Sequence, residues 1–100
     1  MNFEWHDEKA AKNLAKHGIS FEEAETVFGD VFALVNRDDK HSAVEERWLI
    51  VGTASIGYIL TVSYTMRDSK IRIISARRAN EKEREPYQQF RAGRLGSAGV

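Results

Sequence analysis

The chain has 100 residues, the size of one domain with a single hydrophobic core. It has no cysteine, which excludes disulfides and thiolate metal sites, and its formal net charge is zero, which argues against nucleic-acid binding by bulk charge. No apolar run approaches the roughly 20 residues of a membrane span, and the N-terminus is not a signal peptide. We therefore expect a cytoplasmic protein that does not use a membrane.

The N-terminal region predicts a short strand followed by a helix. Residues 2–5 have aromatic side chains at strand spacing. Asp7 is the expected N-cap of a helix that runs through Lys16 and ends at Gly18, which tolerates a positive φ. The expected apolar face of this helix consists of Ala10, Ala11, Leu14 and Ala15.

A second helix is predicted directly afterwards. Ser20 and Glu23 form a Ser-x-x-Glu capping box, in which each residue satisfies a free backbone amide of the other. Gly29-Asp30 is expected to end the helix. Its expected buried face consists of Phe21, Ala24, Val27 and Phe28.

The centre of the chain predicts an antiparallel meander. The expected strands are residues 31–35, 45–51, 58–65 and 69–78, with a polar loop at 36–42 and a tight hairpin at 67–70. Short connections favour antiparallel pairing. Because both helices come before the meander, the predicted class is α+β, with about four strands, helices on one face and the other face free for a ligand.

Side-chain alternation predicts which residues face the core and which face the open side. In the strand at 58–65, the expected core positions are Tyr58, Leu60, Val62 and Tyr64, and the expected open positions are Thr61, Ser63, Thr65 and Arg67. In the last strand, Ile71, Ile73 and Arg77 are expected on the core side, and Lys70, Arg72, Ile74 and Arg78 on the other. Residues 65–78 thus predict a local basic surface in a neutral protein.

The C-terminal region predicts one more helix. Asn80 and Glu83 form a second capping box, and Pro86 predicts a kink or an early end because it lacks a backbone donor. Residues 1–90 are expected to form the single domain, and residues 91–100 a flexible tail.

The chemistry-bearing residues favour a reaction without a cofactor. His6, His17 and His41 lack metal-ligand spacing, and there is no glycine-rich phosphate loop. RNA cleavage fits, because RNA supplies its own nucleophile, the 2′-hydroxyl, and the protein must bind phosphate and move protons. The alternative to a phosphate site on the basic strand is an ordinary solvated sheet face. The alternative to acid/base chemistry by His41 is an ordinary solvated loop residue.

Several segments together resemble a known family. These are Phe3-Glu-Trp5, Asn13-x-x-Lys16-His17-Gly18-Ile19-Ser20-Phe21-Glu22-Glu23-Ala24, Val27-Phe28-x-Asp30, His41-Ser42-x-x-Glu45-Glu46-Arg47, Ile71-Arg72-Ile73-Ile74-Ser75-Ala76-Arg77-Arg78-Ala79, Glu83-Arg84 and Tyr87. They resemble, in order, the BrnT toxins of bacterial type II toxin–antitoxin systems. One departure is Val31, where the family often has proline.

The resemblance implies a RelE-like fold and a ribonuclease that blocks translation by cutting RNA. It also implies a BrnA-like antitoxin that dimerises through a DNA-binding ribbon-helix-helix domain, so that the complex contacts operator DNA through the antitoxin and represses its own operon. The alternative function is an inactive binding module, or a co-repressor of a DNA-binding protein, because the polarised charge suits both.

Matching positions with suitable chemistry are the expected site residues. The expected catalytic residues are His41, Glu46, Arg47, Arg72, Arg77 and Arg78, and the expected RNA-binding residues are Lys16, His17, Thr65, Arg67 and Lys70. The three arginines from residue 72 onward are expected to hold the scissile phosphate. His41 or Glu46 is expected to transfer protons, with Arg47 orienting the carboxylate. No metal ligand and no cofactor are expected.

Overall fold

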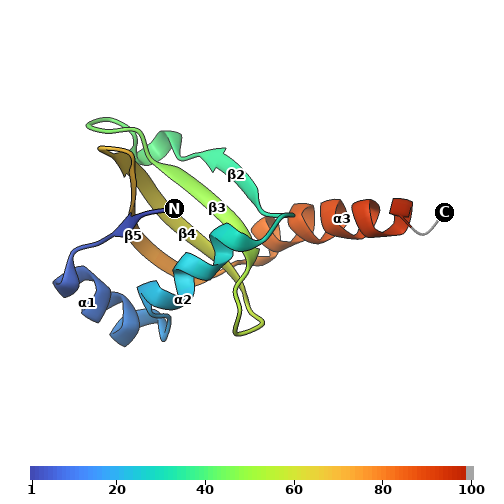
Figure 1. Cartoon of the computed structure of the whole chain (residues 1–100), viewed down its shortest axis with the longest axis horizontal. Helices are drawn as coiled ribbons and strands as arrows, with labels where there is room; N and C mark the ends of the chain where they lie inside the picture. Colours follow the sequence, from blue (N-terminus) through green and yellow to red (C-terminus); the bar gives the residue numbers. More distant parts are fainter. Residues whose placement is uncertain (99–100) are drawn as a thin grey trace.

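The computed structural model describes residues 1–98 and has one five-stranded mixed sheet (Figure 1). The elements are β1 (Phe3–Glu4), α1 (Asp7–His17), α2 (Phe21–Glu25), the 3₁₀ helix η1 (Thr26–Gly29), β2 (Leu34–Arg37), the 3₁₀ helix η2 (Asp39–His41), β3 (Trp48–Thr53), β4 (Ile59–Arg67), β5 (Lys70–Arg78) and α3 (Glu81–Ala98). The strand order is β1-β5-β4-β3-β2, and only β1, against β5, is parallel. The predicted α+β class is confirmed.

Helices α1 and α2 cover one face of the sheet (Figure 1). Phe21, Ala24 and Val27 are fully buried there against Leu60 and Val62 of β4, as predicted. The Ser20 hydroxyl accepts a hydrogen bond from the Glu23 amide at 3.0 Å, so the predicted cap of α2 is present. On the opposite face, Thr61, Ser63 and Thr65 of β4 are buried rather than open as predicted. Thr61 is covered by Glu83 of α3 and Thr65 by the loop before β3, and a groove lies between them.

The buried face of α1 differs from the prediction. Its N-cap is His6, and Asp7 is the first helical residue. Leu14 is half exposed, whereas Asn13 is buried. The Asn13 side chain donates to the carbonyls of Ile19 and Ala76 and accepts from the Ala76 amide, at 2.8–3.1 Å. Of the predicted apolar stripe only Ala10 packs against the core, while Ala11, Leu14 and Ala15 are exposed, because the Asn13 amide holds α1 to β5.

A β-bulge at Ile74 divides β5 into two halves. Ser63 pairs with Ser75 and Tyr64 pairs with Ile73, so Ile74 has no partner and the alternation changes phase there. Ile71 and Ile73 are buried toward the helices, as predicted, but beyond the bulge the buried residue is Ala76.

The change of phase reverses the last two predictions for β5. Arg77 lies on the open face beside Thr61, and Arg78 takes the opposite side, the reverse of the expected positions. At the other end of the strand, the predicted hairpin is confirmed. Asp68 and Ser69 both have positive φ, which is typical of a two-residue type I′ turn.

Helix α3 is attached by its first two turns and then projects from the body (Figure 1). Tyr87 is completely buried, and its hydroxyl hydrogen-bonds Asp30 and, at 2.7 Å, Thr53. Burial alone would raise the pKa of Asp30, but hydrogen bonds from the Thr53 amide, Tyr87 and the Phe32 amide lower it. This network joins α3 to β3 and to the turn before β2.

Other boundaries shift by a few residues. The strand expected at 31–35 lies at residues 34–37, because the Asp30 carboxylate holds the preceding segment in a turn. The strand expected at 45–51 begins at Trp48, and Tyr58 is 45% exposed rather than in the core. Pro86 does not end α3 early. Residues 91–98 of the expected tail are helical, while residues 99–100 lie outside the described part.

Candidate functional site

A groove of about 580 Å³ lies on the open face of the sheet. Its floor is formed by β3, β4 and the bulged part of β5, and one wall by β2 and the loop that contains η2. Of the predicted catalytic residues, His41, Arg47 and Arg77 line it. Arg37 and Lys40 also line it, so the groove has five basic side chains, together with the acidic Asp38 and Asp39.

His41 and Asp38 form a dyad at the wall of the groove. His41 Nδ1 lies 2.9 Å from Asp38 Oδ2. Because an ionised carboxylate only accepts hydrogen bonds, Nδ1 carries the proton and Nε2 of the neutral ring is left to accept one. The Asp38 side chain is 13% exposed and that of His41 62%, so the dyad joins an oriented carboxylate to an accessible imidazole.

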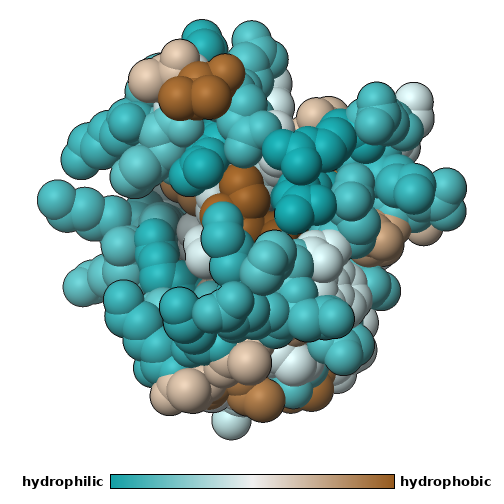
Figure 2. All heavy atoms as spheres, turned by 90° about the vertical axis from the view of Figure 1, so that its left-hand side faces the viewer, coloured by the Kyte–Doolittle hydropathy of each residue, from teal (hydrophilic) through white to brown (hydrophobic). Residues whose placement is uncertain are grey.

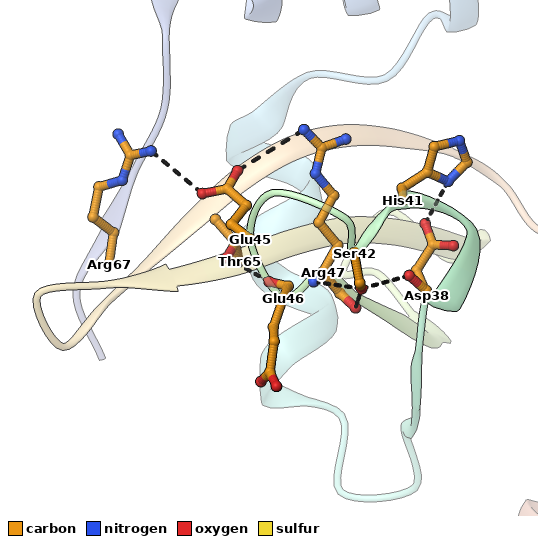
Figure 3. A network of polar contacts seen from close by, with 8 residues as sticks. All are labelled: Asp38, His41, Ser42, Glu45, Glu46, Arg47, Thr65 and Arg67. Carbon is orange, nitrogen blue, oxygen red and sulfur yellow. Dashed lines mark hydrogen bonds and ion pairs between the residues drawn. The ribbon is translucent and has the colours of Figure 1, made fainter.

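The loop that carries the dyad is closed by hydrogen bonds (Figure 3). The Asp38 amide donates to the Arg47 carbonyl at 2.8 Å, and the Arg47 amide donates to the Ser42 hydroxyl at 3.1 Å. The Ser42 hydroxyl donates to the Asp38 carbonyl at 2.6 Å. These contacts fix the start and the end of the loop together, and therefore hold His41 and Arg47 at one site.

Arg47 has spare hydrogen-bonding capacity. Its terminal nitrogen lies 3.9 Å from Glu45, which also pairs with Arg67 at 3.4 Å. Its Nε is buried and makes no hydrogen bond to any described residue. Glu46 points away from both His41 and Arg47 (Figure 3), so Arg47 does not orient the Glu46 carboxylate. Only the Glu46 carbonyl is engaged, by the Thr65 hydroxyl at 2.6 Å.

Arg77 is held by Glu83 at the end of the groove where α3 begins. Its two terminal nitrogens donate to the two Glu83 oxygens at 2.7 and 2.8 Å. The Thr61 hydroxyl and the Asn80 amide donate to the same carboxylate. Burial alone would raise the pKa of Glu83, but these hydrogen bonds, that of Arg77 foremost, lower it to about 2. Arg77 thus connects the groove to the start of α3.

The remaining predicted catalytic arginines lie outside the groove. Arg72 pairs with Glu4 of β1 at 3.0 Å. Arg78 stacks over the ring of Tyr58, with 3.7 Å between its central carbon and the ring centroid. Arg67 of β4 and Lys70 of β5 are exposed and lie opposite each other where the two strands join in the hairpin.

The predicted RNA-binding residues of α1 adjoin the groove. Lys16 and His17, with Lys9 and Lys12, line a shallow depression of about 220 Å³ that ends at Ile74 and Ser75. These two residues of β5 also line the groove. Figure 2 shows the end of the molecule where α1 and the β4–β5 hairpin lie, and hydrophilic residues cover most of it.

Asp38 is the site residue that sequence reasoning missed. The signal was present, because Asp38 and His41 are three residues apart in a polar loop, a spacing at which one turn of 3₁₀ helix brings side chains together. Among residues 1–98, no three His, Cys, Asp or Glu side chains form a group that suits a metal ion. No described helix is long and apolar enough to cross a membrane.

Comparisons with known proteins agree with this architecture. Residues 5–83 match the family described as the ribonuclease toxin, BrnT, of type II toxin–antitoxin systems. The crystal structure of the Brucella abortus ribonuclease toxin BrnT is similar, with a TM-score of 0.64 and 25% sequence identity, over 81% of this chain and 99% of that chain. The comparison with curated proteins gives no match.

The fold and these matches define the class, the ribonuclease toxins of type II toxin–antitoxin systems. Such a protein has an RNA substrate and an antitoxin partner. Within this class the chain belongs to the BrnT family, because the match extends over most of its length.

Proposed function

We propose that this BrnT-family protein is a cytoplasmic, metal-independent endoribonuclease whose active site is the groove around the Asp38–His41 dyad. The observation that carries the proposal is the dyad itself. It offers one oriented imidazole to the groove in which cations from β2, η2, the loop before β3 and β5 converge. Metal independence is supported by the lack of a ligand group among the described residues.

The proposed step is an attack of the RNA on its own backbone. His41 Nε2 takes the proton of the 2′-hydroxyl, O2′ forms a bond to phosphorus, and the bond from phosphorus to O5′ breaks. The leaving O5′ takes a proton from solvent, which the exposed groove admits. Arg47 donates to the phosphoryl oxygens through its terminal nitrogens, whose only carboxylate neighbour among the described residues is Glu45, at 3.9 Å. Asp38 is a positioning residue that stabilises the imidazolium.

We further propose that Lys16 and His17 bind the RNA where it leaves the groove, because their depression shares Ile74 and Ser75 with it. Arg77 attracts the RNA phosphates by its positive charge while it stays hydrogen-bonded to Glu83. Thr65, Arg67 and Lys70 support the loop or extend the basic surface at the hairpin. Arg72 braces β1 through Glu4, away from the reaction.

The proposed partner is a BrnA-like ribbon-helix-helix antitoxin that covers the groove. Inhibition is simplest if the partner occupies the site, and the groove cations suit an acidic segment. In this proposal the hetero-oligomer contacts operator DNA only through the antitoxin and represses its operon.

The test is RNA cleavage by purified protein in excess EDTA, together with growth of a bacterial host that expresses the chain from a tight inducible promoter. Wild type is expected to cleave RNA and arrest growth. His41→Ala should lower the cleavage rate by about 10²–10⁴-fold, the usual contribution of a general base. Asp38→Asn should lower kcat more than it changes KM, because it removes the orienting acceptor.

Asp7→Asn is the matched control, since Asp7 is exposed in the first turn of α1 and lines neither the groove nor the depression beside it. It is expected to behave as wild type. Folded wild-type protein that leaves RNA intact would instead favour the inactive binding module or co-repressor. Cleavage that disappears in EDTA would refute metal independence.

A further inference from the structure

A second pocket lies at the end of β5, on the opposite side from the groove. It has a volume of about 350 Å³. Its lining residues are Gly57, Tyr58, Ile59, Arg78, Ala79 and Arg84. None of them belongs to the groove. The pocket is therefore a site separate from the groove.

The two arginines of this pocket differ from those of the open face in charge pairing. Each arginine of the open face and the sheet edges has a carboxylate within 4 Å: Arg37 with Asp39, Arg47 and Arg67 with Glu45, Arg72 with Glu4 and Arg77 with Glu83. Within residues 1–98, Arg78 and Arg84 have no such partner. Two unneutralised guanidinium groups at one pocket predict an anionic ligand.

The pocket is held in shape by the backbone around it. The Ala54 amide donates to the Tyr58 carbonyl at 2.8 Å, in a turn where Gly57 has a φ of +96°. The Ala79 amide donates to the Ile59 carbonyl at 2.9 Å, so the ends of β4 and β5 are joined. Arg84 donates one terminal nitrogen to the Ala79 carbonyl at 3.2 Å and keeps its other donors.

Tyr58 adds an aromatic surface to the two charges. It is 45% exposed, and the central carbon of the Arg78 guanidinium lies 3.7 Å from the centroid of its ring. Exposed aromatic rings and guanidinium planes stack with the bases of single-stranded RNA, while arginine donors bind its phosphates. Both kinds of group are present here.

We propose that Tyr58, Arg78 and Arg84 form a second RNA-binding subsite, which takes one nucleotide of a single strand whose cleaved bond lies in the groove. This subsite rests on the proposed ribonuclease function. Arg77 and Arg78 are neighbours in β5, so the groove and the subsite lie on the two sides of one strand end. A strand that passes around this end contacts both.

The experiment measures the affinity of full-length protein for a fluorescent 12-nucleotide single-stranded RNA with 2′-O-methyl groups, which binds without being cleaved. Arg78→Ala/Arg84→Ala is expected to weaken binding by about tenfold or more. It should also lower the slope of log Kd against log salt by about 1.4, the value for two phosphate contacts on a single strand. Tyr58→Ala should weaken binding, whereas Tyr58→Phe, which keeps the ring, should not.

The matched control is Arg91→Ala/Arg94→Ala. It removes the same charge from two arginines further along α3, outside the pocket, which lie over the rings of Phe32 and Phe90 and, within residues 1–98, have no carboxylate within 4 Å. It is expected to stay within twofold of wild type. Thermal melting of each variant separates loss of binding from loss of fold.

Wild-type affinity in the folded Arg78/Arg84 variant would overturn the subsite, even if the protein cleaves RNA. Loss of binding to an acidic peptide with RNA affinity unchanged would also overturn it, and would assign the pocket to a protein partner. Reduced RNA affinity in a protein that never cleaves RNA would support the subsite while refuting the ribonuclease.

Discussion

Asn13 is one residue that holds α1 against the sheet. It satisfies the Ala76 amide, the Ala76 carbonyl and the Ile19 carbonyl with a single buried side chain. Strand β1 pairs with β5 only at Ile71 and Arg72, so Asn13 takes the place of a strand partner further along. Asparagine is uncommon inside helices because it competes for backbone groups, and here that ability is what α1 uses.

Replacing Asn13 with alanine should therefore destabilise the protein by about 2–4 kcal/mol, because it leaves three buried backbone groups without a partner. Urea denaturation followed by circular dichroism measures this. Leu14→Ala is the control, since Leu14 is half exposed on the same helix, and it should cost about 1 kcal/mol or less. Equal losses for the two variants would contradict this role of Asn13.

At the scale of elements, α3 depends on the pair of Glu83 and Arg77. Glu83 caps its own helix through Asn80 and binds Arg77 of β5 with the same carboxylate. Its pKa is about 2 in the folded protein, below the ordinary value of 4.5. Because the folded pKa is depressed, the stabilisation is complete above the unfolded pKa and is lost as pH falls toward 2.

Wild type should consequently lose about 2 kcal/mol more stability than Glu83→Gln between pH 6 and pH 2.5. Glutamine keeps the size and the capping oxygen but has no charge to titrate. Denaturant midpoints of the two proteins at each pH give the difference. Parallel pH curves would show that Glu83 is protonated equally in the folded and unfolded states.

Elements that depend on neighbouring residues were predictable, and those that depend on distant ones were not. The caps at Ser20 and Asn80 and the hairpin at residues 67–70 follow from a few adjacent residues. The bulge at Ile74 arises from pairing with β4, and nothing in its local sequence indicates it.

The candidate site divides in the same way. His41 and Arg47 were predicted to be together, and a short closed loop brings them together. The positions of Arg77 and Arg78 were reversed because they depend on the phase of β5. Arg72 was expected in the site, but its pairing with Glu4 depends on a parallel strand from the other end of the chain.

At the scale of the whole molecule, the body and the distal part of α3 together measure 47 × 27 × 26 Å. The net charge is zero, yet basic side chains outnumber acidic ones in the groove and on the adjoining face of α1. Binding to RNA therefore depends on where the charges lie rather than on their total.

RNA affinity should accordingly fall with salt, but with a modest slope. Contacts to about three to five phosphates predict a slope of about 2–3.5 in log Kd against log salt. Fluorescence anisotropy between 50 and 300 mM NaCl, again with uncleavable RNA, measures it. A slope near zero would mean that phosphates are not bound, and a slope above about 6 would indicate diffuse binding by the entire surface.

The bulge at Ile74 has a consequence for how β5 tolerates a deletion. A strand without a bulge sends residues to its two sides in one fixed alternation, and losing a residue inverts that alternation from there on. Here the inversion is already built into β5. Deleting Ile74 would remove the bulge and leave the later residues opposite their present partners, so Arg77 would stay beside Thr61 on the open face and Arg78 on the opposite side. The strand can therefore lose its bulged residue without exchanging the surfaces that the two arginines face.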